Sequence, residues 1–317
     1  MLPAALTRFA IILLMLGGAW LNASAADASN PSSSHRHSNW VTPPVPGKLL
    51  VQHRIASRLA GTEVSYHLLT PPEYWKADAR RYPVLYWLHG SDGGLGGLRP
   101  LAQSFDAAMR ADTLPPLIVV FPNGKPKSLW IDARDGHSPV ESVFIEEIIP
   151  DVDRRYRTIA DRTGRLLEGF SMGGYGAARI GLTHSELFSA ISLLAAGPLQ
   201  PRLSAAEGPA LKSEDRARAL REVFGDDPDY FRAVSPWALA EDYAREGRQP
   251  PLIIRQVIGE LDQSLPANQA FSDHLEGLGI PHQFHRVPGV GHRALKLLEG
   301  LGEANWAFYR RVFPGAD

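Results

Sequence analysis

The chain has 317 residues, of which 44% are hydrophobic and 21% are charged, a composition typical of a globular protein. Its formal net charge is −1 and no basic run stands out, which argues against a nucleic-acid partner. The absence of cysteine excludes disulfides, thiolate metal sites and cysteine nucleophiles. No other cluster of metal ligands and no cofactor motif is visible, so we expect neither a metal nor a cofactor.

The N-terminus has the features of a secretory signal peptide. Arg8 supplies a positive charge, residues 9–20 form an apolar run, and Ala23-Ser24-Ala25 offers a small-residue cleavage site. The run is too short for a comfortable membrane span, which needs about 20 residues. We therefore expect residues 1–25 to be removed, leaving a periplasmic or secreted protein with no stable membrane insertion. An uncleaved N-terminal anchor is the alternative.

Residues 26–47 predict a flexible leader, because Ser, Asn, Pro and His dominate there and apolar side chains are few. His35 and His37 could bind a metal, but a solvated tail is the simpler interpretation. The folded domain is expected to occupy residues 48–317.

The domain should begin with two antiparallel strands and then alternate strands with helices. Strands are predicted at 49–55, 63–69, 83–88, 117–121, 166–167, 190–194, 251–257 and 282–287. Helices are predicted at 100–112, 140–156 with a kink or break at Pro150, 172–182, 267–278 and 295–312. Residues 197–248 are mixed helical and polar and form a candidate cap insert.

This alternation predicts an α/β fold with a mostly parallel central sheet and helices on both faces. In such sheets, ligands bind beyond the carboxyl ends of the strands. The loops that follow the predicted strands are therefore the places to look for chemistry.

Residues 169–174 read Gly-Phe-Ser-Met-Gly-Gly between a short apolar strand and a helix. A G-x-S-x-G motif in that context indicates a nucleophile elbow, where the serine occupies a strained turn. Glycines flank the serine because larger side chains would collide where a strand reverses directly into a helix. Ser171 is the candidate nucleophile, with an ordinary glycine-rich turn as the alternative.

A serine hydroxyl needs a base, usually a histidine oriented by a carboxylate. In this chain order the acid precedes the histidine. The loop after the 251–257 strand offers Glu260 and Asp262, and the loop after the last strand offers His292. We predict Asp262 as the acid, because a turn after Gly259 gives the later residue more reach. His292 is the predicted base; its rivals are His184, His282 and His285, which we expect to cap, pack or face solvent.

A tetrahedral intermediate needs two N–H donors. Met172 N–H follows the nucleophile directly and is one candidate. The loop after Leu88 supplies the other, and we choose Ser91 N–H because Gly90 permits a close backbone approach. His89 is expected to support this loop rather than to take part in catalysis.

Several blocks resemble the putative-esterase family of α/β-hydrolases, which includes S-formylglutathione hydrolases, feruloyl and acetyl-xylan esterases, and the antigen 85 acyltransferases. The resemblance spans roughly residues 48–312 and rests on PVLYWLHGSDGG, LIVVFPNG, FIEEIIPDVDRRYRT, EGFSMGGYGAARIGL and PGVGH. It implies an α/β-hydrolase fold, with Ser171, Asp262 and His292 as the triad and with Met172 and Ser91 as oxyanion donors.

Three further sites carry expectations. Glu168 lies in a strand that should be buried, so it needs a charged partner, either Arg165 or a loop arginine. Trp130 and Asp132 are candidate substrate contacts. Trp237 and Tyr243 are candidate cap residues that more often pack than bind.

The sequence favours a secreted or periplasmic serine carboxylic-ester hydrolase that acts through an acyl-enzyme on small or carbohydrate-linked acyl esters. The alternatives are an acyltransferase, a siderophore esterase, or a non-catalytic carbohydrate-binding envelope protein that keeps the fold.

Overall fold

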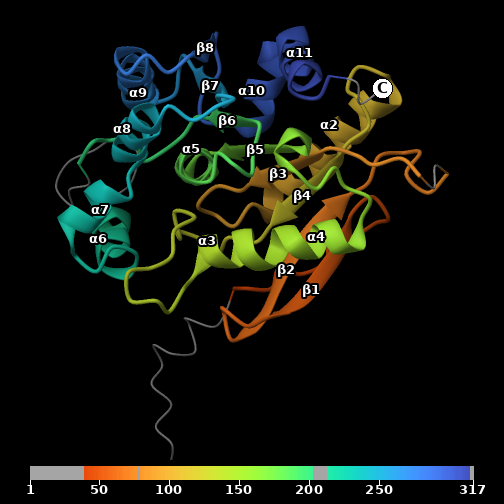
Figure 1. Cartoon of the computed structure of the whole chain (residues 1–317), viewed down its shortest axis with the longest axis horizontal. Coiled ribbons are helices and arrows are strands. Elements are labelled where there is room, and N and C mark those ends of the chain that lie inside the picture. The colour runs from red at the N-terminus through yellow and green to blue at the C-terminus, as the bar shows by residue number, and fades with distance from the viewer. Residues whose placement is uncertain (1–38, 77–78, 203–212, 315–317) are drawn as a thin grey trace, which may run out of the picture.

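An eight-stranded sheet forms the centre of the computed structural model, which describes residues 39–76, 79–202 and 213–314 (Figure 1). The strand order is β1-β2-β4-β3-β5-β6-β7-β8. The first two pairings, β1 with β2 and β2 with β4, are antiparallel, and the rest are parallel. The strands are β1 (Val51–Ser57), β2 (Thr62–Leu69), β3 (Val84–Leu88), β4 (Ile118–Pro122), β5 (Arg165–Phe170), β6 (Ala190–Leu194), β7 (Ile253–Gly259) and β8 (His282–Val287).

The central strands read as continuous apolar runs because helices cover both of their faces. Every residue of β3, β4 and β6 is buried, whereas the residues of the edge strand β1 are exposed or half-buried, except Ser57 at its end. The predicted mostly parallel sheet with helices on both sides is therefore confirmed.

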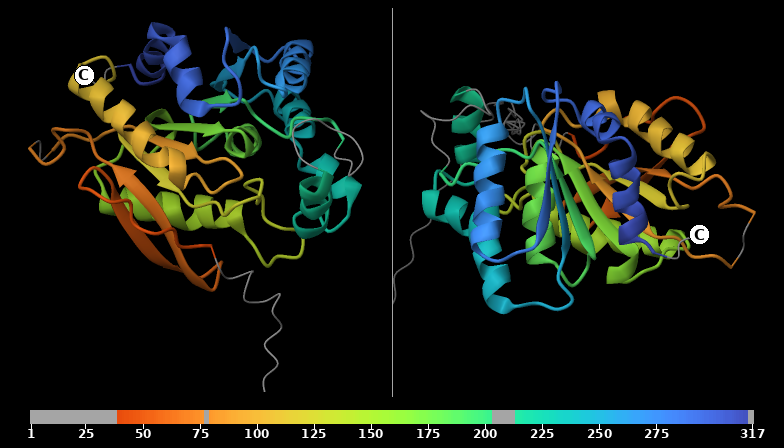
Figure 2. Two further views of the ribbon diagram at one scale, coloured as in Figure 1. Left: turned by 180° about the vertical axis from the view of Figure 1, so that it is seen from behind. Right: turned by 90° about the horizontal axis from the view of Figure 1, so that it is seen from above.

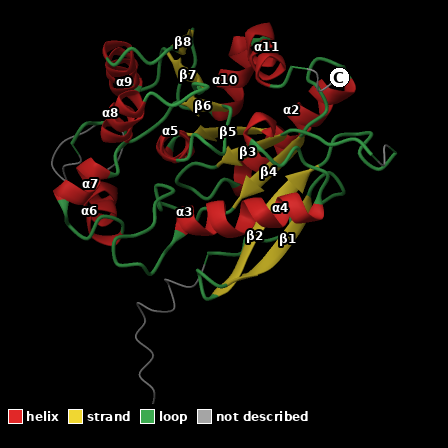
Figure 3. Ribbon diagram, viewed as in Figure 1, coloured by secondary structure: helices red, strands yellow, loops and turns green. Residues whose placement is uncertain are grey.

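Two helical layers flank the sheet (Figures 2 and 3). Two separate clusters of buried apolar side chains fill the space on its two faces. One face carries α3 (Val140–Val143), α4 (Ile149–Arg155), α5 (Met172–Thr183), α8 (Pro236–Glu246) and α9 (Leu265–Gly277). The other carries α2 (Leu95–Arg110), α10 (Ala294–Leu301) and α11 (Glu303–Val312).

The helix expected at 140–156 is broken next to Pro150, as predicted, whereas the helix expected at 295–312 differs from its predicted form. The 140–156 segment is interrupted by a π-helical turn, Phe144–Ile148, just before Pro150, which lacks the N–H that a regular ladder would use. The terminal 295–312 segment is two helices rather than one, because Gly302 takes a positive φ of 56° between α10 and α11.

The expected boundary between the leader and the domain was placed too late. Trp40 is only 2% exposed and belongs to the core cluster beneath β2. Its carbonyl oxygen accepts a hydrogen bond from Ser65 N at 3.0 Å, and Thr42 N donates to Ser65 Oγ at 2.9 Å. Residues 39–47 thus pack on the domain, since one large apolar side chain anchors an otherwise polar stretch. The signal peptide and the rest of the leader, with His35 and His37, lie outside the described residues.

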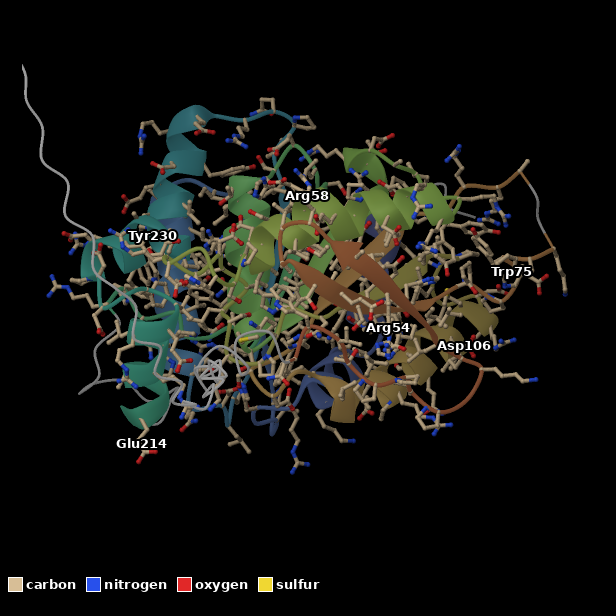
Figure 4. All side chains as sticks on the ribbon, turned by 90° about the horizontal axis from the view of Figure 1, so that it is seen from below. Arg54, Arg58, Trp75, Asp106, Glu214 and Tyr230 are labelled. Carbon is tan, nitrogen blue, oxygen red and sulfur yellow. The ribbon has the colours of Figure 1, made fainter. Side chains whose placement is uncertain are left out.

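The candidate cap insert lies at one end of the molecule. Its described part contains α6 (Ser213–Glu222), α7 (Pro228–Ala233) and α8. Figure 4 shows Glu214 and Tyr230 of this insert at the opposite end of the molecule from Trp75 and Asp106. In the part of the chain that the structure describes, no helix is long and apolar enough to cross a membrane.

A buried ion pair joins β5 to β7. Glu168 Oε2 accepts a hydrogen bond from Arg255 Nη2 at 2.5 Å, and Glu168 Oε1 accepts one from the hydroxyl of Tyr309 at 2.7 Å. Both charged side chains are fully buried. The expected partners were wrong: Arg165 instead bonds Asp153 at 2.7 Å, and the arginine that neutralises Glu168 comes from a strand rather than a loop.

Removing one member of this pair leaves the other charge unpaired in the core. We expect Arg255→Met to lower the free energy of unfolding by about 3–5 kcal/mol, and the double variant with Glu168→Leu to lose less than Arg255→Met alone. Chemical denaturation of the three proteins measures both effects. A double variant that is less stable than Arg255→Met would contradict the assignment.

Candidate active site

The turn between β5 and α5 holds Ser171 in an uncommon backbone conformation, with φ 57° and ψ −118°. Close packing of the backbone around the turn explains its glycines. A Cβ on Gly169 would lie 2.1 Å from the carbonyl oxygen of Gly173, and a Cβ on Gly173 would lie 2.0 Å from the carbonyl oxygen of Leu88. The motif therefore folds as a sharp elbow that presents Ser171 at the start of α5.

Three side chains that are distant in sequence meet in one hydrogen-bonded series. His292 Nε2 lies 2.9 Å from Ser171 Oγ, and His292 Nδ1 lies 2.7 Å from Asp262 Oδ2. Asp262 follows β7 and His292 follows β8, so parallel neighbouring strands bring their loops to the same edge as the elbow. The structure thus brings together the three residues that the sequence singled out.

Asp262 is held as a carboxylate acceptor. Its side chain is 0% exposed, whereas that of His292 is 42% exposed. Burial alone would raise the pKa of Asp262, but hydrogen bonds from His292 and from the Ser264 N–H and hydroxyl lower that pKa below its ordinary value. Ser264 N and Oγ donate to Asp262 Oδ1 at 2.9 and 2.7 Å, which leaves Oδ2 for the imidazole. Sequence analysis missed Ser264, although its position two residues after an acid is typical of such turns.

The rival residues lie in other surroundings. His184 Nε2 is 3.0 Å from Glu141 Oε1, and His282 Nε2 is 2.7 Å from Ser272 Oγ. The loop alternative Glu260 is exposed. None of these residues lines either cleft beside Ser171.

The loop after β3 lies against the elbow. A Cβ on Gly90 would be only 3.5 Å from Ser171 Cβ, and Ser91 lines the surface on both sides of the nucleophile. Met172 is the first residue of α5, so its N–H is one of the donors that have no partner within the helix. The candidate oxyanion donors Ser91 and Met172 therefore flank Ser171.

The buried His89 side chain supports this loop through hydrogen bonds to neighbouring backbone groups, as we expected. Gly124 N donates to His89 Nε2 at 3.0 Å, so Nε2 is an acceptor and Nδ1 carries the proton that it donates to Gly90 O at 2.7 Å. Burial lowers the pKa of His89, which keeps the ring neutral.

The two expected substrate contacts do not reach the clefts. Trp130 is 0% exposed; it donates from Nε1 to His89 O at 3.1 Å and packs against α5. Asp132 caps α3, where its carboxylate accepts hydrogen bonds from Ser142 N at 3.0 Å and from the Ser142 hydroxyl. Both residues support loops rather than line a surface that a substrate could touch. The aromatic Trp237 also packs, through a 2.9 Å hydrogen bond from Nε1 to the carbonyl of Leu199.

Two clefts meet at Ser171 and His292. The larger has a volume of about 810 Å³ and extends across the sheet under α2, with Trp87, Phe121 and Phe170 among its apolar lining. The smaller, of about 220 Å³, lies on the Asp262 side and is lined in part by Pro198 and by Ala219 of the insert. The described residues contain no group of three or more His, Asp or Glu side chains that could hold a metal ion.

The eight-stranded sheet with its elbow and flanking helices has the α/β-hydrolase fold. Solved structures share this fold. A ferulic acid esterase superposes with a TM-score of 0.67 and 22% sequence identity, and the match covers 83% of this chain and 98% of that chain. An S-formylglutathione hydrolase from Agrobacterium tumefaciens has a TM-score of 0.66 and 19% identity, over 83% and 95%.

The family model described as "Putative esterase" matches residues 57–295, and the chain belongs to that family. Esterase Rv1288 of Mycobacterium tuberculosis is 27% identical over 264 residues, which cover 76% of this chain and 55% of the relative. The chain thus spans about half the length of that curated relative.

The strained backbone at Ser171 predicts a difference between two variants that both lack the hydroxyl. Ser171→Gly should be more stable than Ser171→Ala by about 1 kcal/mol, because glycine adopts the positive φ without strain. Thermal or chemical denaturation measures the difference. Ala244→Gly in α8 is the matched control, and it should be destabilised by about 1 kcal/mol. Equal stabilities for the two Ser171 variants would contradict backbone strain at the elbow.

Proposed function

We propose that the protein is a serine carboxylic-ester hydrolase, with Ser171 as nucleophile, His292 as base and Asp262 as the orienting acid. The observation that carries the proposal is the continuous hydrogen-bonded series from Asp262 through His292 to Ser171. A non-catalytic binding protein would have no need of a strained serine bonded to an imidazole.

In the first half of the reaction, Ser171 Oγ attacks the ester carbonyl carbon while His292 Nε2 takes the hydroxyl proton. The carbonyl oxygen becomes an oxyanion that accepts hydrogen bonds from the N–H groups of Ser91 and Met172, and the N-terminus of α5 favours this negative charge. The carbon–oxygen bond to the alcohol then breaks, and His292 Nε2–H protonates the leaving oxygen. An acyl group remains on Ser171.

In the second half, a water molecule attacks the acyl carbon and gives its proton to His292 Nε2. The bond to Ser171 Oγ breaks, the acid leaves, and the proton returns to the serine. Asp262 accepts from Nδ1–H throughout, which keeps Nε2 free to accept the serine proton and stabilises the imidazolium that forms.

The two clefts suit the two arms of an ester. His292 must protonate the leaving oxygen, so the leaving oxygen lies beside its imidazole, which lines both clefts. We assign the acyl arm to the larger cleft, which has the room for it and Trp87, Phe121 and Phe170 in its lining. We propose small or carbohydrate-linked acyl esters as substrates. The structural similarity to a ferulic acid esterase is consistent with this class.

The triad predicts how two variants should behave. Ser171→Ala should abolish turnover of 4-nitrophenyl acetate. Asp262→Asn should lower kcat by about 10⁴-fold. An asparagine can still accept from Ser264 through its oxygen, so its NH₂ group must face His292 Nδ1, which places the ring proton on Nε2 and blocks the base.

Steady-state kinetics on the folded variants measures both effects. Glu260→Gln is the control, because Glu260 is exposed two residues away and should leave kcat within about two-fold of wild type. Unchanged turnover in Ser171→Ala would remove the assignment.

We also propose that the protein is secreted or periplasmic after removal of residues 1–25. Expression of the full chain in a host with a general secretory pathway should give a mature N-terminus at Ala26, detectable by intact mass and N-terminal sequencing. Recovery of the chain with residues 9–20 still attached would contradict signal-peptide cleavage.

A further inference from the structure

A third cavity lies next to the smaller cleft. It has a volume of about 910 Å³, and it is lined mainly by the segment that follows β4 and by α6 of the insert. The two segments are connected where Arg134 N donates to the carbonyl oxygen of Val223 at 2.9 Å. The exposed side chain of Lys127 lines both this cavity and the smaller cleft, so the two spaces are adjacent.

Positive charge dominates the lining of this cavity. Among the described residues that line it, four are Lys or Arg and two are Asp or Glu. We call the basic ones the cationic cluster: Lys125, Lys127, Arg218 and Arg221. The acidic ones are Asp135 and Glu222, which leaves an excess of two positive charges. Because the whole chain has a formal net charge of −1, this excess is local to the cavity.

A strained turn holds the two lysines of the cluster. Lys125 and Lys127 have positive φ values of 62° and 61° on either side of Pro126, which costs about 1–3 kcal/mol for each residue. Lys125 Nζ donates to Ser138 Oγ at 3.1 Å and lies 4.9 Å from the centre of the Trp40 ring. Backbone strain of this kind is concentrated where a segment contacts a ligand, and here it directs both lysines to one cavity.

An anion in the cavity would meet positive charge from two sides. Lys125 is half-buried, and this burial lowers its pKa, so a nearby anion would stabilise its charged form. Arg218 and Arg221 are exposed and lie three residues apart on α6, so they share one face of that helix. The turn therefore supplies ammonium groups to the cavity, and α6 supplies guanidinium groups.

We propose that the cationic cluster binds an anionic group, a carboxylate or a phosphate, on the alcohol arm of the ester substrate. The acyl arm is assigned to the larger cleft, which leaves the alcohol arm to the smaller one, and Ser171, His292 and Lys127 all line that cleft. Guanidinium and ammonium groups bind carboxylate and phosphate oxygens through charge-assisted hydrogen bonds. This inference rests on the proposed function and adds to it the class of alcohol that the enzyme releases.

The test uses acetylated methyl glycosides of a monosaccharide and of a disaccharide. Within each set the compounds differ only in the exocyclic group, which is a hydroxymethyl, a carboxylate or a phosphorylated hydroxymethyl. The acetyl ester is placed at each ring hydroxyl in turn, because the distance between ester and anion decides whether both sites are filled at once.

For wild type at low salt, kcat/KM should favour an anionic ester over its neutral counterpart by at least about 10-fold at one acetyl position. The anion with the larger ratio is the one that the cavity accepts. Since the attraction is electrostatic, the ratio should fall toward one as sodium chloride rises to about 1 M. Ratios within about two-fold of one for both anions at every position would overturn the proposal.

Variants of the cationic cluster locate the effect. Lys127→Gln and Arg221→Gln should each lower the ratio by about 3-fold or more, and the double variant should bring it close to one. Lys127→Arg should keep most of the ratio, because the charge remains. Arg54→Gln is the control and should keep the wild-type ratio, since Arg54 is exposed on β1 and lies far from Glu214 of α6 (Figure 4). A preference that persists in the double variant would overturn the proposal.

A binding measurement separates this inference from the hydrolase assignment. By isothermal titration calorimetry, Ser171→Ala should bind the deacetylated anionic glycoside at least about 10-fold more tightly than the neutral one. If wild type hydrolysed none of the esters, or if Ser171→Ala hydrolysed them as well as wild type, the hydrolase assignment itself would fall. A normal hydrolase without preference for an anionic alcohol would leave that assignment standing and remove only the role of the cationic cluster.

Discussion

The site depends on how closely three backbone segments approach one another at the elbow. β5, the first turn of α5 and the end of β3 come so near that a single methyl group on Gly169 or Gly173 would overlap a carbonyl oxygen. This close approach requires the positive φ of Ser171, and α5 begins directly after that residue. It also places the loop after β3 next to the Ser171 side chain. The geometry of the candidate site is thus a result of backbone packing, and the side chains of Asp262 and His292 are positioned relative to it.

Much of this could be predicted from the sequence because the signals were local. The spacing of Gly169, Ser171 and Gly173 between a strand and a helix favoured an elbow over an ordinary glycine-rich turn, and the acid and the histidine each follow a predicted strand. The positions of the strands could also be predicted, because buried strands of a parallel sheet appear in the sequence as unbroken apolar runs. The parallel topology then places the loops at the carboxyl ends of these strands at one edge of the sheet, however far apart the loops are in the sequence.

The rest depended on contacts between distant segments. Trp130 looked like a cleft residue, but its loop turns inward and the ring becomes the support for His89. Glu168 pairs with Arg255 two strands away, across Ser192 on β6, and no local pattern links these residues. Trp40 likewise shows how one apolar side chain can draw a polar segment onto a domain.

The insert is connected to the nucleophile by a short chain of contacts. The Tyr230 hydroxyl of α7 donates to the carbonyl oxygen of Asp132 at 3.0 Å, two residues from Trp130, which in turn bonds the backbone of His89. That loop carries Ser91. A substitution in α7 is thereby connected to the loop that carries Ser91, the proposed oxyanion donor. If the proposed mechanism holds, substitutions in α7 would change turnover while every residue of the proposed site stays the same.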